Sequence, residues 1–308
     1  MAKKFGEIQV GTEFATYCLC KQTNVGTTSN HKAYINMTLF DGQTEILGKK
    51  WDHEGPIPPN GSALAIKGQM VTYNGKLQIA INQWRPAKAE ECSPSDFLPH
   101  YEGDTDGLFA EIWSEVEKIS DRGLQSVVCS ILTNNKDAFI TAPAASGHHH
   151  AYIGGLVQHT SGVCKLALQI AQLRPDYIDY DLLRAGGILH DIGKIISYSW
   201  ENTIDYSDDG RFLDHIVLGI EVVKKQADEA GVPWEMTRKL LHIIASHHQK
   251  LDWGSPVEPV LKEAFIISQA DQLDASLQKI DIGLKTASEN GQEWADIKDF
   301  KWQFKTPL

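Results

Sequence analysis

The residues in this sequence that are best suited to chemistry are His190 and Asp191, within the run from Gly187 to Lys194. The apolar residues before them predict the end of a helix that breaks at Gly193. An imidazole, a carboxylate and an ammonium group therefore lie within five residues, which suits a divalent metal ion that holds a phosphate. Adjacent residues leave a helix about 100° apart, so this pair can share one ion only if other helices supply further ligands.

Further histidines and aspartates do lie on the apolar faces of predicted helices. His159 aligns with Leu156 and Val163 after Gly155, and His247 aligns with Leu240 and Ile244 in the helix of 234–248. In the last long helix, Asp271 aligns with Val260, Ala264 and Ile267. A lone inward carboxylate is costly unless it is paired or bound to a metal. The candidate metal ligands are His159, His190, Asp191, His215, His247, His248 and Asp271.

The elements that must position these residues differ between the two parts of the chain. From Phe14 to about Ile81, apolar and polar residues alternate with a period of two, which is typical of half-buried strands. We expect strands at 14–20, 33–40, 45–51, 63–73 and 76–81, with a tight turn at Asn74-Gly75. Five short strands in so few residues predict a small five-stranded β-barrel over residues 1–88.

The predicted barrel resembles the OB-fold of nucleic-acid-binding proteins, in which aromatic side chains stack on bases and lysines or arginines follow the phosphates. The candidate nucleic-acid contacts are Tyr34, Trp51, Tyr73, Trp84, Lys49 and Lys76. The alternative is that some of these aromatic residues belong to the barrel core and that the lysines only favour solubility.

Beyond the barrel, the period changes. Residues 89–107 are acidic, contain Ser and Pro and lack a period, which predicts a linker. Residues 108–308 then show helical periodicity and should form an all-helical domain with a C-terminal tail. The expected fold is therefore multidomain, β plus all-α, with the barrel preceding the helical domain.

Composition and charge limit the class of protein. The 308 residues are 42% hydrophobic and 22% charged, as in ordinary globular proteins. The net charge is -11, but residues 1–90 carry +3 and the remainder -14, so the barrel could still hold a polyanion. The five cysteines are scattered, no signal peptide is evident, and no apolar run approaches the roughly 18 residues of a membrane span. We expect a cytoplasmic protein without a membrane segment.

The ordered series of candidate ligands resembles the HD-domain metal-dependent phosphohydrolases, an all-helical superfamily. With the barrel included, the chain is more similar to the YhaM-type 3'-5' exoribonucleases, which join an N-terminal OB-fold to a C-terminal HD domain. The matching segments are 149–160, 189–194, 210–219, 246–248 and 270–275. Gln158 stands where the family usually has Glu, and Gln249 where Gly is common, but neither replaces a candidate ligand.

The resemblance implies a metal-dependent 3'-5' exoribonuclease that hydrolyses single-stranded RNA to nucleoside 5'-monophosphates, with single-stranded DNA left open. We expect His159, His190, Asp191 and Asp271 to hold one metal ion and His215, His247 and His248 to hold a second, with Asp191 bridging the two. Imidazole and carboxylate ligands fit Mn, Fe, Zn, Ni or Co better than Ca or Mg. The resemblance favours Mn.

Other residues near the ligands have predicted roles. We expect Asp191 and Lys194 to act in catalysis, with Lys194 neutralising a non-bridging phosphate oxygen. His149 and His150 are assigned to the substrate phosphate or to protonation of the leaving 3'-oxygen. Asp274 follows Asp271 by one turn, so it either orients a ligand histidine or pairs with Lys279 or Lys285.

Two other functions stay open at this point. HD domains with similar ligands also serve as nucleotidases or cyclic-dinucleotide phosphodiesterases, although a barrel would be superfluous for a mononucleotide. The chain could also be a single-stranded nucleic-acid-binding protein with a structural metal site. Self-association is a further expectation, because the resemblance suggests it and four aromatic residues near the C-terminus offer apolar surface, unless they only seal the core: Trp294, Phe300, Trp302 and Phe304.

Overall fold

The structure is a computed structural model that describes residues 4–28, 30, 32–53, 55–146 and 151–307. The chain forms two compact units. The first, here called the barrel unit, comprises residues 1–99 with residues 200–203. The second, the helical unit, comprises residues 100–199 and 204–308. The predicted linker of 89–107 contains the short 3-10 helix η2 (Pro94–Phe97). The predicted boundaries at 88 and 107 stay a prediction.

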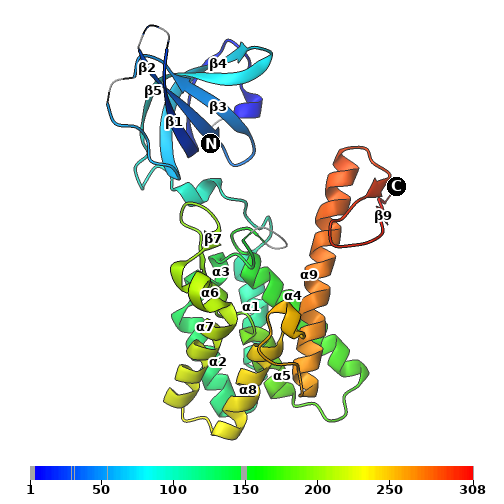
Figure 1. Ribbon diagram of the computed structural model, residues 1–308. Coiled ribbons are helices and arrows are strands. Elements are labelled where there is room, and N and C mark those ends of the chain that lie inside the picture. Colours follow the sequence, from blue (N-terminus) through cyan, green and yellow to red (C-terminus); the bar gives the residue numbers. More distant parts are fainter. Residues whose placement is uncertain (1–3, 29, 31, 54, 147–150, 308) are drawn as a thin grey trace. The chain divides into compact units, whose positions relative to one another are not determined.

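The barrel unit is a closed five-stranded barrel, which confirms the predicted fold of this part (Figure 1). Its strands are β1 (Glu13–Thr27), β2 (Ala33–Phe40), β3 (Glu45–Lys50), β4 (Ser62–Tyr73) and β5 (Lys76–Pro86), with η1 (Phe5–Glu7) before them. They pair in the order β1-β2-β3-β5-β4, and β4 closes the barrel on β1. Only the β3–β5 pair is parallel among these strands.

Two strands run further than the alternation predicts, because bulges interrupt the period of two. β1 changes its register with β2 between Cys20 and Gln22 and then continues to Thr27. In β5, Ile81 pairs with Gly68 and Gln83 pairs with Lys67, so Asn82 is the extra residue of a bulge. Beyond the bulge in β5, Trp84 takes the side of Ile81, and beyond the bulge in β1, Val25 is 58% exposed. The regular alternation therefore ends at each bulge although the strand does not.

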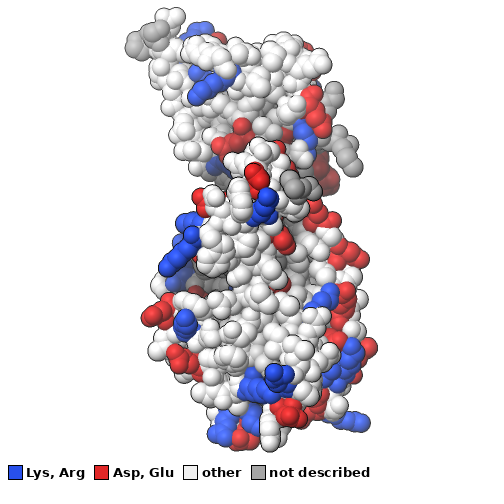
Figure 2. All heavy atoms as spheres, turned by 90° about the vertical axis from the view of Figure 1, so that its right-hand side faces the viewer, with Lys and Arg blue, Asp and Glu red and all other residues white. Residues whose placement is uncertain are grey.

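The helical unit confirms the predicted all-helical class (Figure 1). Its helices are α1 (Thr105–Val116), α2 (Arg122–Asn134), α3 (Lys136–Thr141), α4 (Gly155–Leu173), α5 (Tyr180–Leu189), α6 (Lys194–Ser197), α7 (Asp208–Glu229), α8 (Trp234–Ser246), η3 (Leu251–Trp253) and α9 (Lys262–Glu289). Two short strand pairs accompany them: β6 (Tyr198–Ser199) with β7 (Asp205–Tyr206), and β8 (Trp294–Ala295) with β9 (Phe304–Lys305). On the face that Figure 2 draws, acidic and basic side chains are interspersed over this unit.

Local capping and packing explain where these helices begin. The side chain of Asp121 accepts a hydrogen bond from the amide of Leu124 at the start of α2, and Asp179 and Ser207 cap α5 and α7 in the same way. Helix α4 packs against α1, α3, α5 and α9, so its buried face lies in the middle of the unit. Among the described residues, no helix combines the length and apolar composition that crossing a membrane requires.

The start of α9 corrects one detail of the sequence analysis. The helix begins at Lys262, so Val260 precedes it and is 83% exposed. The expected alignment of Val260 with Asp271 is therefore wrong. The physical reason is that the amide of Val260 donates a hydrogen bond to Nε2 of His242, at 3.0 Å, instead of joining a helical turn.

The aromatic residues near the C-terminus divide into two kinds. Phe300 and Phe304 pack against a small cluster around Ala287 at the end of α9. Trp294 and Trp302 remain 47% and 62% exposed. The tail thus seals part of its own core and leaves two large apolar side chains at the surface, while self-association stays a prediction.

Candidate metal centre

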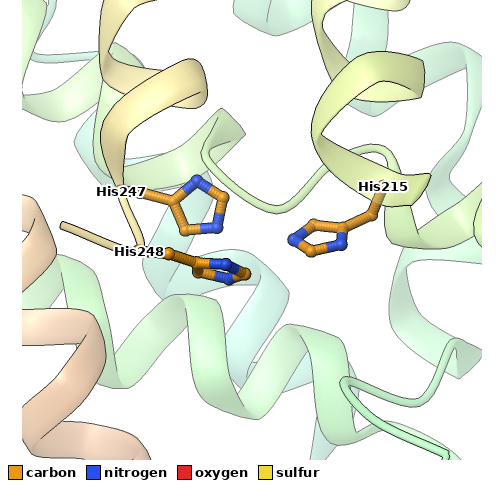
Figure 3. A group of neighbouring side chains, drawn as sticks. All are labelled: His215, His247 and His248. Atoms are coloured by element: carbon orange, nitrogen blue, oxygen red, sulfur yellow. The ribbon is translucent and has the colours of Figure 1, made fainter. Parts of the chain in front are cut away.

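The seven candidate ligands come from five helices and lie together inside the helical unit. His159 lies in α4, His190 and Asp191 directly follow α5, His215 lies in α7, His247 and His248 directly follow α8, and Asp271 lies in α9. Two groups have ligand atoms within 4.8 Å of one another: His159, His190 and Asp191, and His215, His247 and His248. In Figure 3, the rings of His247 and His248 point toward the ring of His215, which comes from the opposite helix.

Asp191 lies between the two groups. Its Oδ2 atom is 3.4 Å from the Nε2 atoms of both His159 and His190. Its Oδ1 atom is 3.5 Å from Nε2 of His215 and 3.4 Å from Nε2 of His247. Asp271 extends the first group, because its Oδ1 atom lies 3.1 Å from Nε2 of His159. Each oxygen of Asp191 thus faces a different pair of imidazoles.

These spacings fit the coordination of a metal ion. Two ligand atoms that each lie about 2.1 Å from one ion, at tetrahedral or octahedral angles, are about 3.0 to 3.4 Å apart. Oδ1 of Asp191 and the Nε2 atoms of His215 and His247 are buried and have no hydrogen-bond partner among the described residues, whereas Oδ2 of Asp191 is paired with Lys194. Buried polar atoms without partners are costly. A divalent cation would satisfy these three atoms, so the residues present fit the metal that an HD-type site requires.

The other ring nitrogen of each histidine is already held. Nδ1 of His190 lies 2.8 Å from the carbonyl of Gly187, Nδ1 of His247 lies 2.8 Å from that of Ile244, and Nδ1 of His248 lies 3.0 Å from that of Trp253. A carbonyl oxygen can only accept, so Nδ1 carries the hydrogen and the lone pair of Nε2 is left for a metal. The chain therefore fixes the tautomer that a ligand needs.

Two aspartates hold the remaining rings. Asp274 Oδ2 lies 2.7 Å from Nδ1 of His159, which confirms the alternative that Asp274 orients a histidine of the candidate ligand set. Lys279 pairs instead with Asp299, at 2.5 Å. Asp214 contacts Nδ1 of His215 through its carboxylate.

Asp214 is a residue of the site that the sequence pattern does not mark. Its backbone has φ 60° and ψ 161° inside α7. Residues other than glycine rarely adopt this backbone conformation, which costs about 1 to 3 kcal/mol. Its side chain is 60% exposed, so no periodic pattern marks it. Its position directly before His215 is the only signal that the sequence offers.

Burial and neighbouring charges set the protonation of the site. Burial lowers the pKa of His215 and His247, and burial together with His247 lowers the pKa of His248 to about 4. These imidazoles are therefore neutral at pH 7, which is the form that binds metal. Burial opposes ionisation of Asp191, but the nearby ammonium group of Lys194 and the imidazoles of His190 and His159 outweigh it and hold the pKa of Asp191 well below its usual value.

His159 behaves in the opposite way. Burial would lower its pKa, but hydrogen bonds to Asp191, Asp271 and Asp274 raise that pKa well above the usual value. The pKa of Asp271 is lowered, because its contacts with His159 outweigh burial. Three carboxylates around one imidazole thus favour a positive charge at this point, as a metal cation would supply.

Of the other predicted catalytic residues, the structure describes Lys194 but not His149 and His150. Lys194 is buried, and its Nζ atom lies 2.6 Å from Asp191 Oδ2. His149 and His150 lie outside the described residues.

Gln249, which directly follows the histidine pair, has φ 71°. This left-handed backbone gives a physical reason for the glycine that is common at this position in the family.

The structure separates the six candidate nucleic-acid contacts into three places on the barrel. The rings of Tyr34 and Trp51 lie 5.2 Å apart, and Lys49 Nζ lies 4.5 and 4.4 Å from their centroids. Tyr73 and Lys76 are paired across the turn of the β4–β5 hairpin. Trp84 packs partly against the barrel core and also lines a cavity.

Comparisons with known proteins give two family matches and several relatives of this chain. The profile of the family described as HD domain matches residues 156–276, and that of a family described as putative helicase matches residues 97–175. Three proteins called 3'-5' exoribonuclease YhaM are each 34% identical to this chain over 289 residues, or 92% of this chain and 92% of each relative. They come from Listeria monocytogenes, from the serotype 4b strains CLIP80459 and F2365 and the serovar 1/2a strain EGD-e.

Proposed function

This chain belongs to the family of the 3'-5' exoribonuclease YhaM, and from this premise we propose that it shortens single-stranded RNA from the 3' end. In this reaction a water molecule attacks the phosphorus of the last phosphodiester bond. The bond from phosphorus to the 3'-oxygen of the preceding nucleotide breaks, and that oxygen receives a proton. The product is a nucleoside 5'-monophosphate, and the shortened RNA ends in a 3'-hydroxyl.

The observation that carries this proposal is the position of Asp191 between two groups of imidazoles. We propose that the first group, with Asp271, and the second group each hold one divalent cation and that Asp191 bridges them. Imidazole and carboxylate ligands suit Mn, Fe, Zn, Ni or Co, and the family favours Mn. When bound, two such cations lower the pKa of a shared water and offset the charge of the phosphate.

The chain itself supplies a fixed positive charge at this point. The ammonium group of Lys194 is buried and directed at Asp191, so it cannot move away into solvent. We propose that it contacts a non-bridging oxygen of the scissile phosphate, where it stabilises the charge that develops in the transition state. The roles of His149 and His150 on the phosphate or the leaving 3'-oxygen stay predictions.

The barrel unit would hold the RNA on the 5' side of the bond that is cut. The cluster of Tyr34, Trp51 and Lys49 supports this proposal, because it offers stacking surface and a positive charge within one small area. Tyr73 and Lys76 would add a second contact at the hairpin. We also propose a cytoplasmic location, since all five cysteines are free.

Labelled oligonucleotides test the proposal. Metal-stripped protein would be incubated with 5'-labelled single-stranded RNA or DNA of matched sequence, with and without Mn, beside an Asp191→Ala variant. We expect a ladder that shortens from the 3' end, nucleoside 5'-monophosphates in the mass spectrum, and no change in the variant. A ladder from the DNA would show that the protein also cleaves single-stranded DNA. Intact oligonucleotides with Mn, Fe, Zn, Ni and Co alike would contradict the proposal.

A further inference from the structure

The barrel unit contains a cavity of about 1070 Å³ that the metal centre does not explain. It lies against β1, β4 and β5 and is bordered by the end of β3 and the loop that follows. Residues on its wall include Trp84, His53, Lys50, Lys67, Asn82 and Gln83. None of the described residues that line it is an aspartate or a glutamate, although the chain has 40 acidic residues. This composition favours an anionic ligand.

Two of the three cationic side chains that line the cavity are available for a ligand. Among the described residues, neither Lys50 nor Lys67 has an ion-pair partner. Arg85 also lines the cavity, but Glu91 holds it through contacts of 2.6 and 2.7 Å. The charge that could meet a phosphate therefore comes from the two lysines.

The cavity also offers an anchored aromatic surface. Trp84 packs in part against the barrel core, which fixes its ring, and it is only partly buried, so another part faces the cavity. The ring of His53 lies 6.4 Å from that of Trp84, at an angle of 34°. A fixed ring with an open face is a stacking platform for a base of any sequence.

A bulge places polar groups beside this ring. Asn82 is the extra residue between the pairs that Ile81 and Gln83 make with β4. The bulge turns Trp84, rather than Gln83, to the side of Ile81, and it leaves the exposed amide side chains of Asn82 and Gln83 at the cavity. Amide groups of this kind can form hydrogen bonds with the edges of bases.

The cavity is distinct from the Tyr34–Trp51 cluster but adjoins it. Successive side chains of a strand point to opposite sides. At the end of β3, Lys49 lies over Tyr34 and Trp51, whereas Lys50 lines the cavity.

We propose that this cavity binds a nucleotide of single-stranded RNA, with the base stacked on Trp84 and the neighbouring phosphates bound by Lys50 and Lys67. The proposal rests on the exoribonuclease function, because the 3' end is consumed at the metal centre and the barrel then holds RNA on the 5' side. It adds a second contact site beyond the Tyr34–Trp51 cluster.

Charge reversal tests the two lysines. The full chain, kept metal-free with a chelator so that RNA is not cut, would be titrated into 5'-fluorescein oligo(U) of about 16 nucleotides, a length that fills a barrel of this class. The Lys50→Glu/Lys67→Glu variant should bind at least about tenfold more weakly, and its slope of log affinity against log salt should be about 1.4 smaller, at roughly 0.7 for each lost phosphate contact. A matched variant, Lys298→Glu/Lys301→Glu, changes the net charge equally at exposed sites in the helical unit. Equal weakening in both variants would overturn the proposal.

Stacking on Trp84 requires a separate test, because this residue also packs against the core. Trp84→Leu should weaken binding by about 5- to 100-fold and Trp84→Phe should restore most of it, with circular dichroism to verify that both variants fold. Wild-type protein would also be crosslinked by ultraviolet light to oligo(U) that contains 4-thiouridine. Crosslinks at Trp84 or His53 would support the site, whereas crosslinks confined to Tyr34 and Trp51 would overturn it.

Activity on two substrates separates this proposal from the proposed function. With Mn, the Lys50→Glu/Lys67→Glu variant should cleave a dilute 16-mer at least about tenfold more slowly than the wild type, and its ratio of 16-mer to diribonucleotide cleavage rates should fall. If both proteins cleave the diribonucleotide and cleave the 16-mer equally fast, the cavity proposal fails alone. If the wild type cleaves neither substrate, the exoribonuclease function fails, and with it the function on which the cavity proposal depends.

Discussion

Asp274 Oδ2 lies 2.7 Å from Nδ1 of His159, so a carboxylate of α9 fixes the imidazole of a candidate ligand in α4. Replacing Asp274 with Ala should weaken Mn binding by about 10- to 100-fold, because His159 loses its fixed tautomer and some of its basicity. Calorimetric titration of metal-free protein with Mn measures the effect. The control is Asp281→Ala, at an exposed position of the same helix. Unchanged Mn affinity in Asp274→Ala would show that the ring is held by other contacts.

Metal removal should lower the stability of the helical unit. Oδ1 of Asp191 and the Nε2 atoms of His215 and His247 are buried without a hydrogen-bond partner among the described residues, and a bound cation would satisfy them. Free Mn at 100 times its dissociation constant should raise the free energy of unfolding by about 2.7 kcal/mol for each site. Thermal melting with a chelator and then with added Mn measures the difference. The Asp191→Ala variant should lose most of this Mn-dependent shift, and a full shift in the variant would argue against a bridging role.

Lys194 should contribute to the rate more than to substrate binding. Lys194→Met keeps most of the length of the side chain but removes the charge, so kcat should fall by about 10²- to 10³-fold with a smaller change in KM. Metal content by elemental analysis should accompany the kinetics, because Lys194 also contacts Asp191. Lys165→Met is the matched control, since Lys165 pairs with Glu111 at the surface. A change in KM alone would assign Lys194 to ground-state binding.

Gln249→Gly should stabilise the protein. A residue with a side chain at φ 71° is strained by about 1 to 2 kcal/mol, and glycine is not. Because glycine also gives the unfolded chain more freedom, the net gain in the free energy of unfolding should be about 1 kcal/mol or less. Urea denaturation measures it, with Gln249→Ala as a control that retains the strain. A loss of stability in Gln249→Gly would mean that the glutamine side chain makes contacts worth more than the strain.

The sequence could predict the elements because local patterns set them. Alternation identified the barrel strands, and helical spacing placed His159 and His247 on buried faces. The ends of β1 and β5 could not be predicted from the sequence, because the bulges near Cys20 and at Asn82 interrupt the alternation. Val260 was misplaced for a similar reason, since its amide bonds to His242, which lies 18 residues away.

What the sequence by itself determined is which residue types are available and which face of an element carries them. Only the tertiary structure decided how Asp191 lies between two groups of imidazoles, because helical periodicity fixes a face but not the helix that packs against it. The same holds for Asp274, which is 115 residues from His159 in the chain, and for the exposed Asp214. It also holds for the barrel, where Lys49 and Lys50 are neighbours in sequence. Lys49 lies over Tyr34 and Lys50 lines the cavity, because successive side chains of a strand point to opposite sides.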